Sequence, residues 1–305
     1  MFDIERRFND RFRYPYVFLS EEPLPDEFKE SVRWMAGGNK AKVEFGLITE
    51  HWGYPRWIDV DRAENAAQDW ADANEQATDR AGWRHMVRYW AGPFALHPLL
   101  RKYQYVWRLE AGSHYTCDFE YDPFVYMQNN RLSYGFAISM EEMPDAVPSI
   151  WGSVLTFIKE NLVLALESQN SLGWLNDKKA RKGQFAFNRC QFLSNFEILD
   201  LDFVRSHKYQ KLFDHLDRDG GIYYERWTDA SVRSLAAALF LDSASVHWFD
   251  DIGYKHDRLH NCPQSTSRQM RCHCDPKKST HLVPMSCAAR WNSTSTSIDP
   301  RSLLT

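Results

Sequence analysis

The chain has 305 residues, of which 44% are hydrophobic and 15% aromatic, and its formal net charge is −4. This length predicts one large globular domain or two small ones, and scattered Lys and Arg in a net acidic chain argue against a nucleic-acid-binding protein. No apolar run approaches the roughly 20 residues that span a bilayer, and the first residues, MFDIERRFND, lack the regions of a signal peptide.

Short apolar runs alternate with helical patterns, which is typical of α/β proteins. YPYVFLS (14–20) and VEFGLIT (43–49) predict strands, and the amphipathic segment 25–36 between them predicts a helix, so the three form a βαβ unit. Further strands are predicted at 104–110, 133–139, 192–199 and 245–251. Further helices are predicted at 59–80, 83–90, 148–167, 202–217 and 230–241, with a short one after YDPF (121–124).

The last residues, 278–305, are rich in Ser and Thr without a sustained period, so we expect a poorly ordered tail. This tail holds Asn292, the acceptor of an Asn-x-Ser/Thr tripeptide. The six cysteines include the CHC sequence at 272–274, which is not a paired C-x-x-C arrangement. Disulfides or free thiols are therefore favoured over zinc, and six cysteines allow about fifteen pairings.

The segment 105–124, YVWRLEAGSHYTCDFEYDPF, starts as a strand and then becomes acidic. Its carboxylates are Glu110, Asp118, Glu120 and Asp122. Glu110 either ends a strand with its side chain in water or belongs to a functional site. The residues of this segment alone leave both readings open.

Ordered local blocks from about residue 4 to residue 277 resemble the fungal KTR-type α-1,2-mannosyltransferases, also called glycolipid 2-α-mannosyltransferases. Several blocks contain rare Trp, His and Cys, which makes the resemblance more specific than a single motif. The blocks are FNDRFRYPYVFLSEEP, EHWGYPRWID, WRHMVRYWAGPFALHPLLRKYQYVWRLEAG, CDFEYDPF, FLSNFEILDLDF, GGIYYERWTDASVRSLAAALFLD, HWFDDIGYKH, NCP and RCHCDP.

The resemblance implies an α/β, GT-A-like single domain over residues 1–277, with a mixed central sheet flanked by helices. Its implied activity is retaining transfer of mannose from GDP-mannose to the 2-hydroxyl of an acceptor mannose on a protein or lipid glycan. Mn²⁺ is the implied cofactor, and the implied location is the Golgi lumen, as a type II membrane protein. Fold alone does not establish chemistry, so the residues must supply it.

Two metal ligands follow from the family pattern. The Glu of its E-P-G triplet is Glu110, in Glu110-Ala111-Gly112, and the last His of its D-D-I-G-Y-H-H block is His256. A carboxylate and an imidazole suit Mn²⁺, which neutralises a departing diphosphate. His247 is expected to belong to a buried strand and not to bind metal.

Two carboxylates are the implied catalytic residues. Glu197 in LSNFEIL matches the family's candidate near the reacting carbon, as a nucleophile or as a stabilising charge. Its alternative is a buried strand Glu paired with an Arg or a backbone donor. Asp229 in ERWTDAS matches another family carboxylate, and its alternative is simple N-capping of the helix that follows.

Substrate contacts are expected from Trp83 and Arg84 in the WRHM block and from Tyr254 in the DDIGYKH block. The family usually has Tyr where this chain has Trp83, and Trp can stack on a substrate but has no hydroxyl.

Relatives also carry a strand ahead of the segment matching IERRFNDRF, together with a membrane anchor and stem. We expect the sheet of this chain to lack that first strand and GDP-mannose binding to suffer as a result. Three functional classes follow from the sequence: a mannosyltransferase, a non-catalytic relative that binds mannosyl glycans or a partner enzyme, and an unrelated carbohydrate-binding or hydrolase domain.

Overall fold

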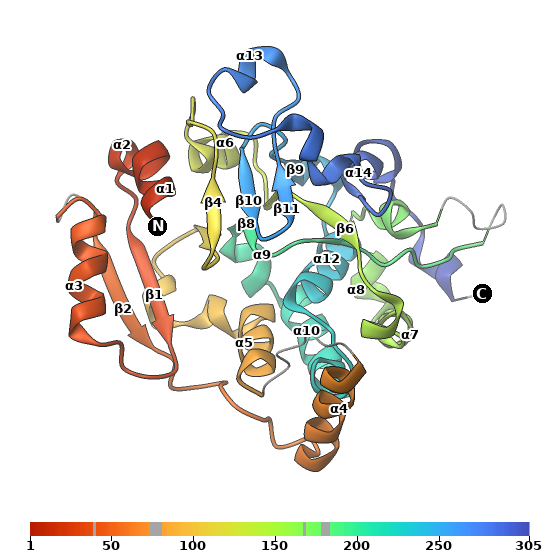
Figure 1. Ribbon diagram of the computed structural model, residues 1–305. Coiled ribbons are helices and arrows are strands. Elements are labelled where there is room, and N and C mark those ends of the chain that lie inside the picture. Colours follow the sequence, from red (N-terminus) through yellow and green to blue (C-terminus); the bar gives the residue numbers. More distant parts are fainter. Residues whose placement is uncertain (39–40, 74–80, 167–168, 178–183, 305) are drawn as a thin grey trace.

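The computed structural model describes residues 1–38, 41–73, 81–166, 169–177 and 184–304. Its main sheet has four strands in the order β3-β8-β5-β9. Two of them, β8 and β9, are labelled near the middle of the molecule in Figure 1. β8 pairs antiparallel with both β3 and β5, whereas β9 pairs parallel with β5, so the sheet is mixed. The strands are β3 (Tyr105–Leu109), β5 (Tyr134–Phe136), β8 (Phe196–Asp200) and β9 (Val246–Trp248).

Three smaller sheets surround the main one. β1 and β2 pair in parallel and flank α3, which confirms the predicted βαβ unit. β4 and β11 pair on either side of β10, and β6 pairs with β7. The bounds are β1 (Tyr16–Ser20), β2 (Val43–Leu47), β4 (Ser113–Tyr115), β6 (Ser139–Glu141), β7 (Cys190–Phe192), β10 (Tyr254–His256) and β11 (Leu259–Asn261).

The predicted helices are present, with two of them divided into shorter pieces. The segment predicted as one helix at 148–167 forms α7 and α8, and 202–217 forms α9 and α10; residues 74–80 of the helix predicted at 59–80 lie outside the described residues. In the described part of the chain, no helix is both long and apolar enough to cross a membrane. The helices are α1 (Phe2–Ile4), α2 (Asp10–Phe12), α3 (Asp26–Met35), α4 (Val60–Ala73), α5 (Ala81–Ala91), α6 (Pro123–Asn129), α7 (Ile150–Glu160), α8 (Leu162–Leu166), α9 (Leu201–Arg205), α10 (His207–Asp219), α11 (Gly221–Tyr224), α12 (Asp229–Phe240), α13 (Thr266–Gln269) and α14 (Ala288–Thr294).

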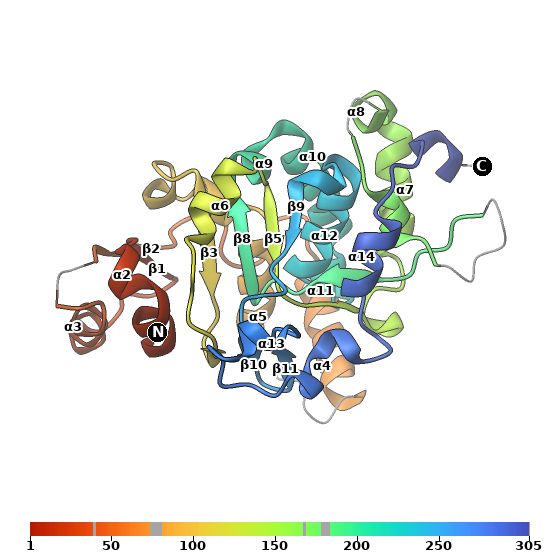
Figure 2. The ribbon, with the colours of Figure 1, turned by 90° about the horizontal axis from the view of Figure 1, so that it is seen from above.

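The main sheet separates two apolar cores, because successive side chains of a strand point to opposite faces. On β8, Phe196 and Ile198 join a core that also contains Phe8 and Trp107. Leu199 joins the larger core on the other face, to which α5, α10 and α12 contribute. Seen from above, β3, β8, β5 and β9 lie side by side, and α10 and α12 lie beside β9 (Figure 2).

The C-terminal segment differs from the sequence prediction. Residues 278–304 are described and include α14, on which Trp291 is 4% exposed and lies within the larger core. Cys287 is bonded to Cys190 of β7, which ties this segment to the sheet region. The expectation of a disordered tail is therefore wrong for these residues, because a few apolar side chains and one disulfide are sufficient to order it.

All six cysteines form disulfides, as favoured over a zinc site. The pairs are Cys117–Cys272, Cys190–Cys287 and Cys262–Cys274. The groups of three candidate metal ligands found among the described residues all include these disulfide sulfurs, so they provide no metal site.

Candidate active site

The pairing of β3 with β8 places Arg108 directly opposite Glu197. Both side chains project toward the face covered by α5 and α12, because Trp107 and Ile198 occupy the opposite face. Arg108 is 8% exposed and Glu197 is fully buried. The pairing of β3 with β8 therefore places the Arg108 guanidinium and the Glu197 carboxylate side by side in the interior.

Arg233 of α12 forms an ion pair with Glu197. Its Nε lies 2.8 Å from Glu197 Oε2, and neither side chain is exposed to solvent. Tyr134 donates its hydroxyl to the same carboxylate oxygen at 3.3 Å, whereas Glu197 Oε1 is buried without a hydrogen-bond partner among the described residues. Burial raises the pKa of Glu197 to about 7, and the nearby Arg233 and Arg108 oppose this rise.

Asp229 is the first residue of α12, but it is not the helix cap. The cap is Thr228, whose hydroxyl accepts the Ser231 backbone N–H at 3.1 Å. Asp229 is therefore free of that role, and its carboxylate accepts a hydrogen bond from Arg108 Nη1. Its Oδ2 also lies 3.8 Å from Arg233 Nη2, so the two arginines share this carboxylate.

Glu110 lies at the end of β3 and completes a chain of charges. Arg108 Nη2 donates to Glu110 Oε2 at 2.8 Å, while Arg108 Nη1 binds Asp229. We call the connected residues Glu110, Arg108, Asp229, Arg233 and Glu197 the charge network. This network joins the predicted metal-side carboxylate to both predicted catalytic carboxylates.

The turn after Glu110 brings His256 to the same end of the sheet. Ser113 closes the turn by donating its backbone N–H to the Glu110 carbonyl at 3.2 Å, and Gly112 has a φ of +78°. A positive φ at the third turn position favours Gly, and Pro is common just before it, so Ala111 fits where the family has Pro. β10 then pairs with β4 so that His256 lies opposite Ser113. Glu110 and His256, which are far apart in the sequence, therefore both lie at the turn between β3 and β4.

The donor set of Glu110 and His256 fits a divalent cation such as Mn²⁺, which accepts carboxylate and imidazole ligands. One Glu110 oxygen is hydrogen-bonded to Arg108, and a carboxylate has further lone pairs for a metal. Their roles as metal ligands stay predictions.

The predicted substrate residues occupy different environments. Trp83 on α5 is partly buried, and the Arg226 guanidinium lies 4.5 Å from its ring centroid. Arg84 is 1% exposed, and its Nη1 donates to the carbonyls of Ile222 and Glu225 at 3.2 and 2.8 Å. The structure therefore gives Arg84 a role in holding α5 to α11, and its predicted contact with substrate stays a prediction.

Tyr254 is also buried, at 1% exposure, and donates its hydroxyl to the Asn195 carbonyl at 2.8 Å. Burial, with the nearby Glu110 charge, raises the pKa of this hydroxyl. Tyr254 thus supports the start of β8, and its predicted contact with substrate stays a prediction.

The other acidic residues of segment 105–124 have structural partners. Asp122 caps α6 by accepting the Phe124 backbone N–H at 2.9 Å. Asp118 pairs with Arg7 at 2.5 Å, and Glu120 pairs with Arg271 at 2.8 Å. Of the four carboxylates in this segment, only that of Glu110 joins the charge network.

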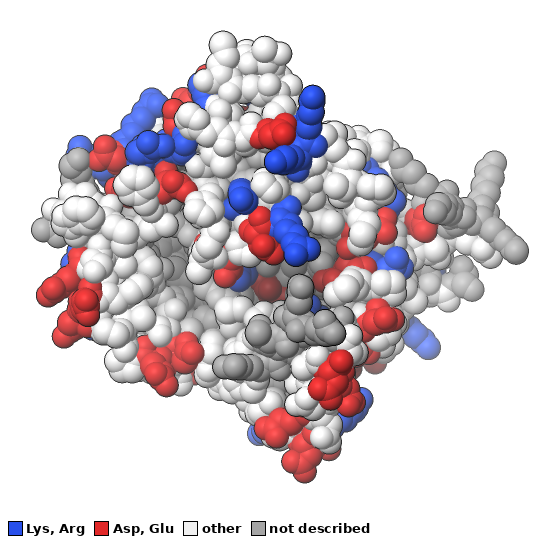
Figure 3. Space-filling view, viewed as in Figure 1, with Lys and Arg blue, Asp and Glu red and all other residues white. Residues whose placement is uncertain are grey.

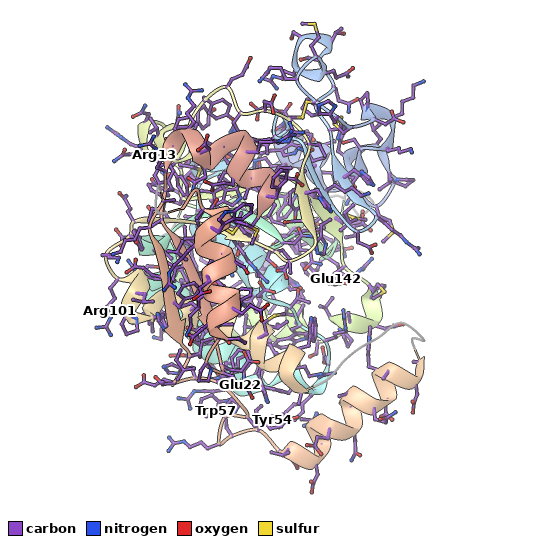
Figure 4. All side chains as sticks on the ribbon, turned by 60° about the vertical axis from the view of Figure 1, so that its left-hand side comes forward. Arg13, Glu22, Tyr54, Trp57, Arg101 and Glu142 are labelled. Atoms are coloured by element: carbon purple, nitrogen blue, oxygen red, sulfur yellow. A yellow bond between two sulfur atoms is a disulfide. The ribbon has the colours of Figure 1, made fainter. Side chains whose placement is uncertain are left out.

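The EHWGYPRWID block packs against α5 and α10. Tyr54 and Trp57 lie on the connection between β2 and α4 (Figure 4). The Tyr54 ring lies 4.7 Å from that of His85, and Trp57 Nε1 donates to the Asp217 carbonyl at 2.9 Å. This matched block therefore holds the scaffold in place and adds no member to the charge network.

Arg108 and Arg233 were missed as site residues, although the sequence contains a signal for each. Both are charged residues within otherwise apolar runs, YVWRL and ASVRSLAAALFL, and Arg is almost never fully buried without a partner.

In the space-filling view, acidic side chains gather over α3 and α4, and the surface near the centre of this face is hollowed where acidic and basic side chains lie side by side (Figure 3).

The chain is similar to one described protein family along most of its length. A family described as glycolipid 2-alpha-mannosyltransferase matches residues 1–296, which extends beyond the predicted boundary at 277. Glycolipid 2-alpha-mannosyltransferase 2 of Candida albicans is 39% identical over 292 residues, covering 95% of this chain and 62% of that protein. The chain thus spans less than two thirds of this relative's length.

Two solved structures share the fold. Core-mannan synthase A from Aspergillus fumigatus, in a Mn/GDP form, is 36% identical with a TM-score of 0.86, covering 97% of this chain and 80% of that one. Ktr4p from S. cerevisiae, in complex with GDP, is 37% identical with a TM-score of 0.88, covering 99% and 78%. The predicted mixed-sheet α/β fold is confirmed, and the chain belongs to the glycolipid 2-alpha-mannosyltransferase family.

Proposed function

We propose that this protein is a retaining α-1,2-mannosyltransferase that moves mannose from GDP-mannose to the 2-hydroxyl of an acceptor mannose on a protein or lipid glycan. The charge network carries the proposal, because Glu110, Asp229 and Glu197 come from three elements and meet through Arg108 and Arg233. The names of the relatives and the Mn/GDP and GDP complexes of the solved structures support it.

The reaction breaks the bond between mannose C1 and the GDP oxygen, which releases GDP. It forms a bond between C1 and the oxygen of the acceptor 2-hydroxyl, whose proton passes to the leaving phosphate or to water. Positive charge develops at C1 in the transition state, so an ionised carboxylate nearby is favourable. Glu197 is the proposed carboxylate, either as a nucleophile that forms a glycosyl-enzyme or as a charge in a front-side displacement. Arg233 and Arg108 favour its ionised form against the effect of burial.

A divalent cation bound by Glu110 and His256 would act as a Lewis acid on the leaving diphosphate. Arg108 orients the Glu110 carboxylate through its 2.8 Å hydrogen bond while it binds Asp229 on its other nitrogen. This contact fixes the metal-side carboxylate relative to the two proposed catalytic ones. The partly buried Trp83 is the proposed stacking surface for a sugar or base.

The proposed location is the Golgi lumen, as a type II membrane protein. Three disulfides support residence in an oxidising compartment, since disulfides are rare where thiols are kept reduced. A non-catalytic relative is not favoured, because the chain retains both proposed catalytic carboxylates and connects them by buried ion pairs.

The test supplies GDP-mannose, Mn²⁺ and methyl α-mannoside and identifies the product linkage by NMR. An α-1,2-linked disaccharide is expected, and its formation should depend on added Mn²⁺. Glu197→Gln should abolish most turnover, whereas Glu27→Gln on the exposed face of α3 should not change it. Unchanged turnover in Glu197→Gln would remove Glu197 from the chemistry, and no transfer by the unmodified chain would refute the proposed activity.

A further inference from the structure

A groove of about 650 Å³ lies beside β9, the outer strand of the main sheet in the described residues. All three residues of β9 line it, and His247 and Trp248 point to opposite faces of the sheet because they are consecutive. The groove therefore wraps around the sheet edge between α6 and α14. Its lining residues used below are Tyr126, Asn130, His247, Trp248, Asp250 and Asn292.

The lining of this β9 groove combines aromatic rings with neutral polar groups. Trp248 and Tyr126 line the groove with partly buried aromatic rings, and Asn130 and Asn292 line it with exposed amides. Asp250 is the only charged side chain among the described lining residues, and it already pairs with Arg268 at 3.3 Å. A neutral ligand with apolar faces and many hydroxyls, which is the chemistry of a sugar chain, matches this lining better than a charged one.

Two polar groups in the groove are not used by the fold. The Tyr126 and His247 rings lie 4.8 Å apart, and in the described part of the chain neither the Tyr126 hydroxyl nor the His247 imidazole forms a hydrogen bond. Burial lowers the pKa of His247, so at neutral pH one ring nitrogen donates and the other accepts. His247 lies on β9, in line with its expected place in a strand, and it is not a member of the charge network.

We propose that the β9 groove is an accessory binding site for a mannose-terminated oligosaccharide, separate from the charge network. This inference rests on the proposed function, since it assigns the groove to the acceptor class of that reaction. Phe136 of β5 stands between Trp248 and Glu197 in the sheet, so their backbones lie roughly 10 Å apart. A glycan in the groove would hold an acceptor chain on the enzyme while its mannose end reacts elsewhere.

The experiment titrates α-1,2-linked mannotriose into the unmodified protein without GDP-mannose or Mn²⁺, and measures binding by ligand-observed NMR and by tryptophan fluorescence. Saturable binding is expected. Tyr126→Ala, which removes a ring and a hydroxyl, should weaken it about fivefold, and the exposed Asn292→Ala should weaken it less. Trp34→Ala is the matched aromatic control, because Trp34 is 79% exposed on α3, and it should not change binding.

Addition of GDP with Mn²⁺ tests whether the two sites are separate, and the bound mannotriose should remain. The inference would be overturned if GDP with Mn²⁺ displaced all of the mannotriose, or if the unmodified protein did not bind mannotriose. It would also be overturned if Tyr126→Ala and Asn292→Ala bound mannotriose with the affinity of the unmodified protein. An extended peptide that binds beside β9 where the oligosaccharide does not would also overturn it. If the protein binds mannotriose but transfers no mannose, the proposed function alone is refuted. If it transfers mannose but Tyr126→Ala and Asn292→Ala do not change mannotriose binding, this inference alone is refuted.

Discussion

Removing Arg233 should destabilise the protein strongly, because it leaves a buried carboxylate without its cation. Arg233 and Glu197 are both fully buried, with 2.8 Å between Nε and Oε2. Breaking such a pair from one side typically costs about 3–5 kcal/mol. We therefore expect Arg233→Met to lower the free energy of unfolding by about 3–5 kcal/mol, whereas Arg258→Met at an exposed position should change it by less than about 0.5 kcal/mol.

A double-mutant cycle with Glu197→Gln isolates the ion pair. Arg233 also donates to the Trp90 carbonyl at 2.6 Å, and that loss is the same in both Glu197 backgrounds, so it cancels in the cycle. The double variant should be more stable than the sum of the single effects predicts, by about 1–3 kcal/mol. Reversible urea unfolding followed by tryptophan fluorescence measures all four proteins. Additive effects within about 0.5 kcal/mol would show that the pair is not coupled and refute the reasoning.

Three further predictions concern pH, metal binding and the C-terminal segment. Because the folded pKa of Glu197 is raised from 4.5 to about 7, its contribution to stability is fully present below pH 4.5 and is lost as pH rises through 7. Glu197→Gln should therefore flatten this part of the curve of unfolding free energy against pH. An unchanged slope in that variant would contradict the raised pKa. Glu110→Ala should weaken Mn²⁺ binding, measured by electron paramagnetic resonance, by at least about tenfold. Glu120→Ala, from the same acidic segment, should leave Mn²⁺ binding unchanged. Equal losses in both variants would reject Glu110 as a ligand. Replacing Cys190 and Cys287 together by Ala should cost about 4 kcal/mol in thermal or urea unfolding, since the disulfide spans 97 residues, and a cost below about 1 kcal/mol would mean that the C-terminal segment contributes little to the fold.

The sequence predicted the elements that local periodicity specifies. β1, α3 and β2 follow from apolar runs on either side of an amphipathic helix, and β3 and β8 follow from β-branched and aromatic residues. Short strands such as β4 and β10 were not predicted, because three residues carry no readable period and their pairing joins residues far apart in the chain. His256 is placed opposite Ser113 by that pairing alone.

The candidate site was predicted through its carboxylates, and its cations were not. Glu110, Glu197 and Asp229 stand in recognisable blocks, whereas Arg108 and Arg233 acquire meaning only when β3, β8 and α12 are packed together. Composition also misled at the C-terminus, where Ser and Thr are abundant and the apolar residues follow no sustained period. Trp291 and Cys287 nevertheless order that segment, because contact with a distant core and not average composition decides whether it folds.

The incomplete hydrogen bonding of the charge network argues that stability alone does not explain it. Glu197 Oε1 and Arg233 Nη1 are buried without hydrogen-bond partners among the described residues, although most buried polar groups in proteins are satisfied. An apolar pair of similar volume at these positions is often as stable as a buried ion pair or more so. Local rules are typically broken where function requires it. These two unsatisfied atoms lie where the proposed reaction needs an ionisable carboxylate in a desolvated site, held by a cation that cannot lose its charge.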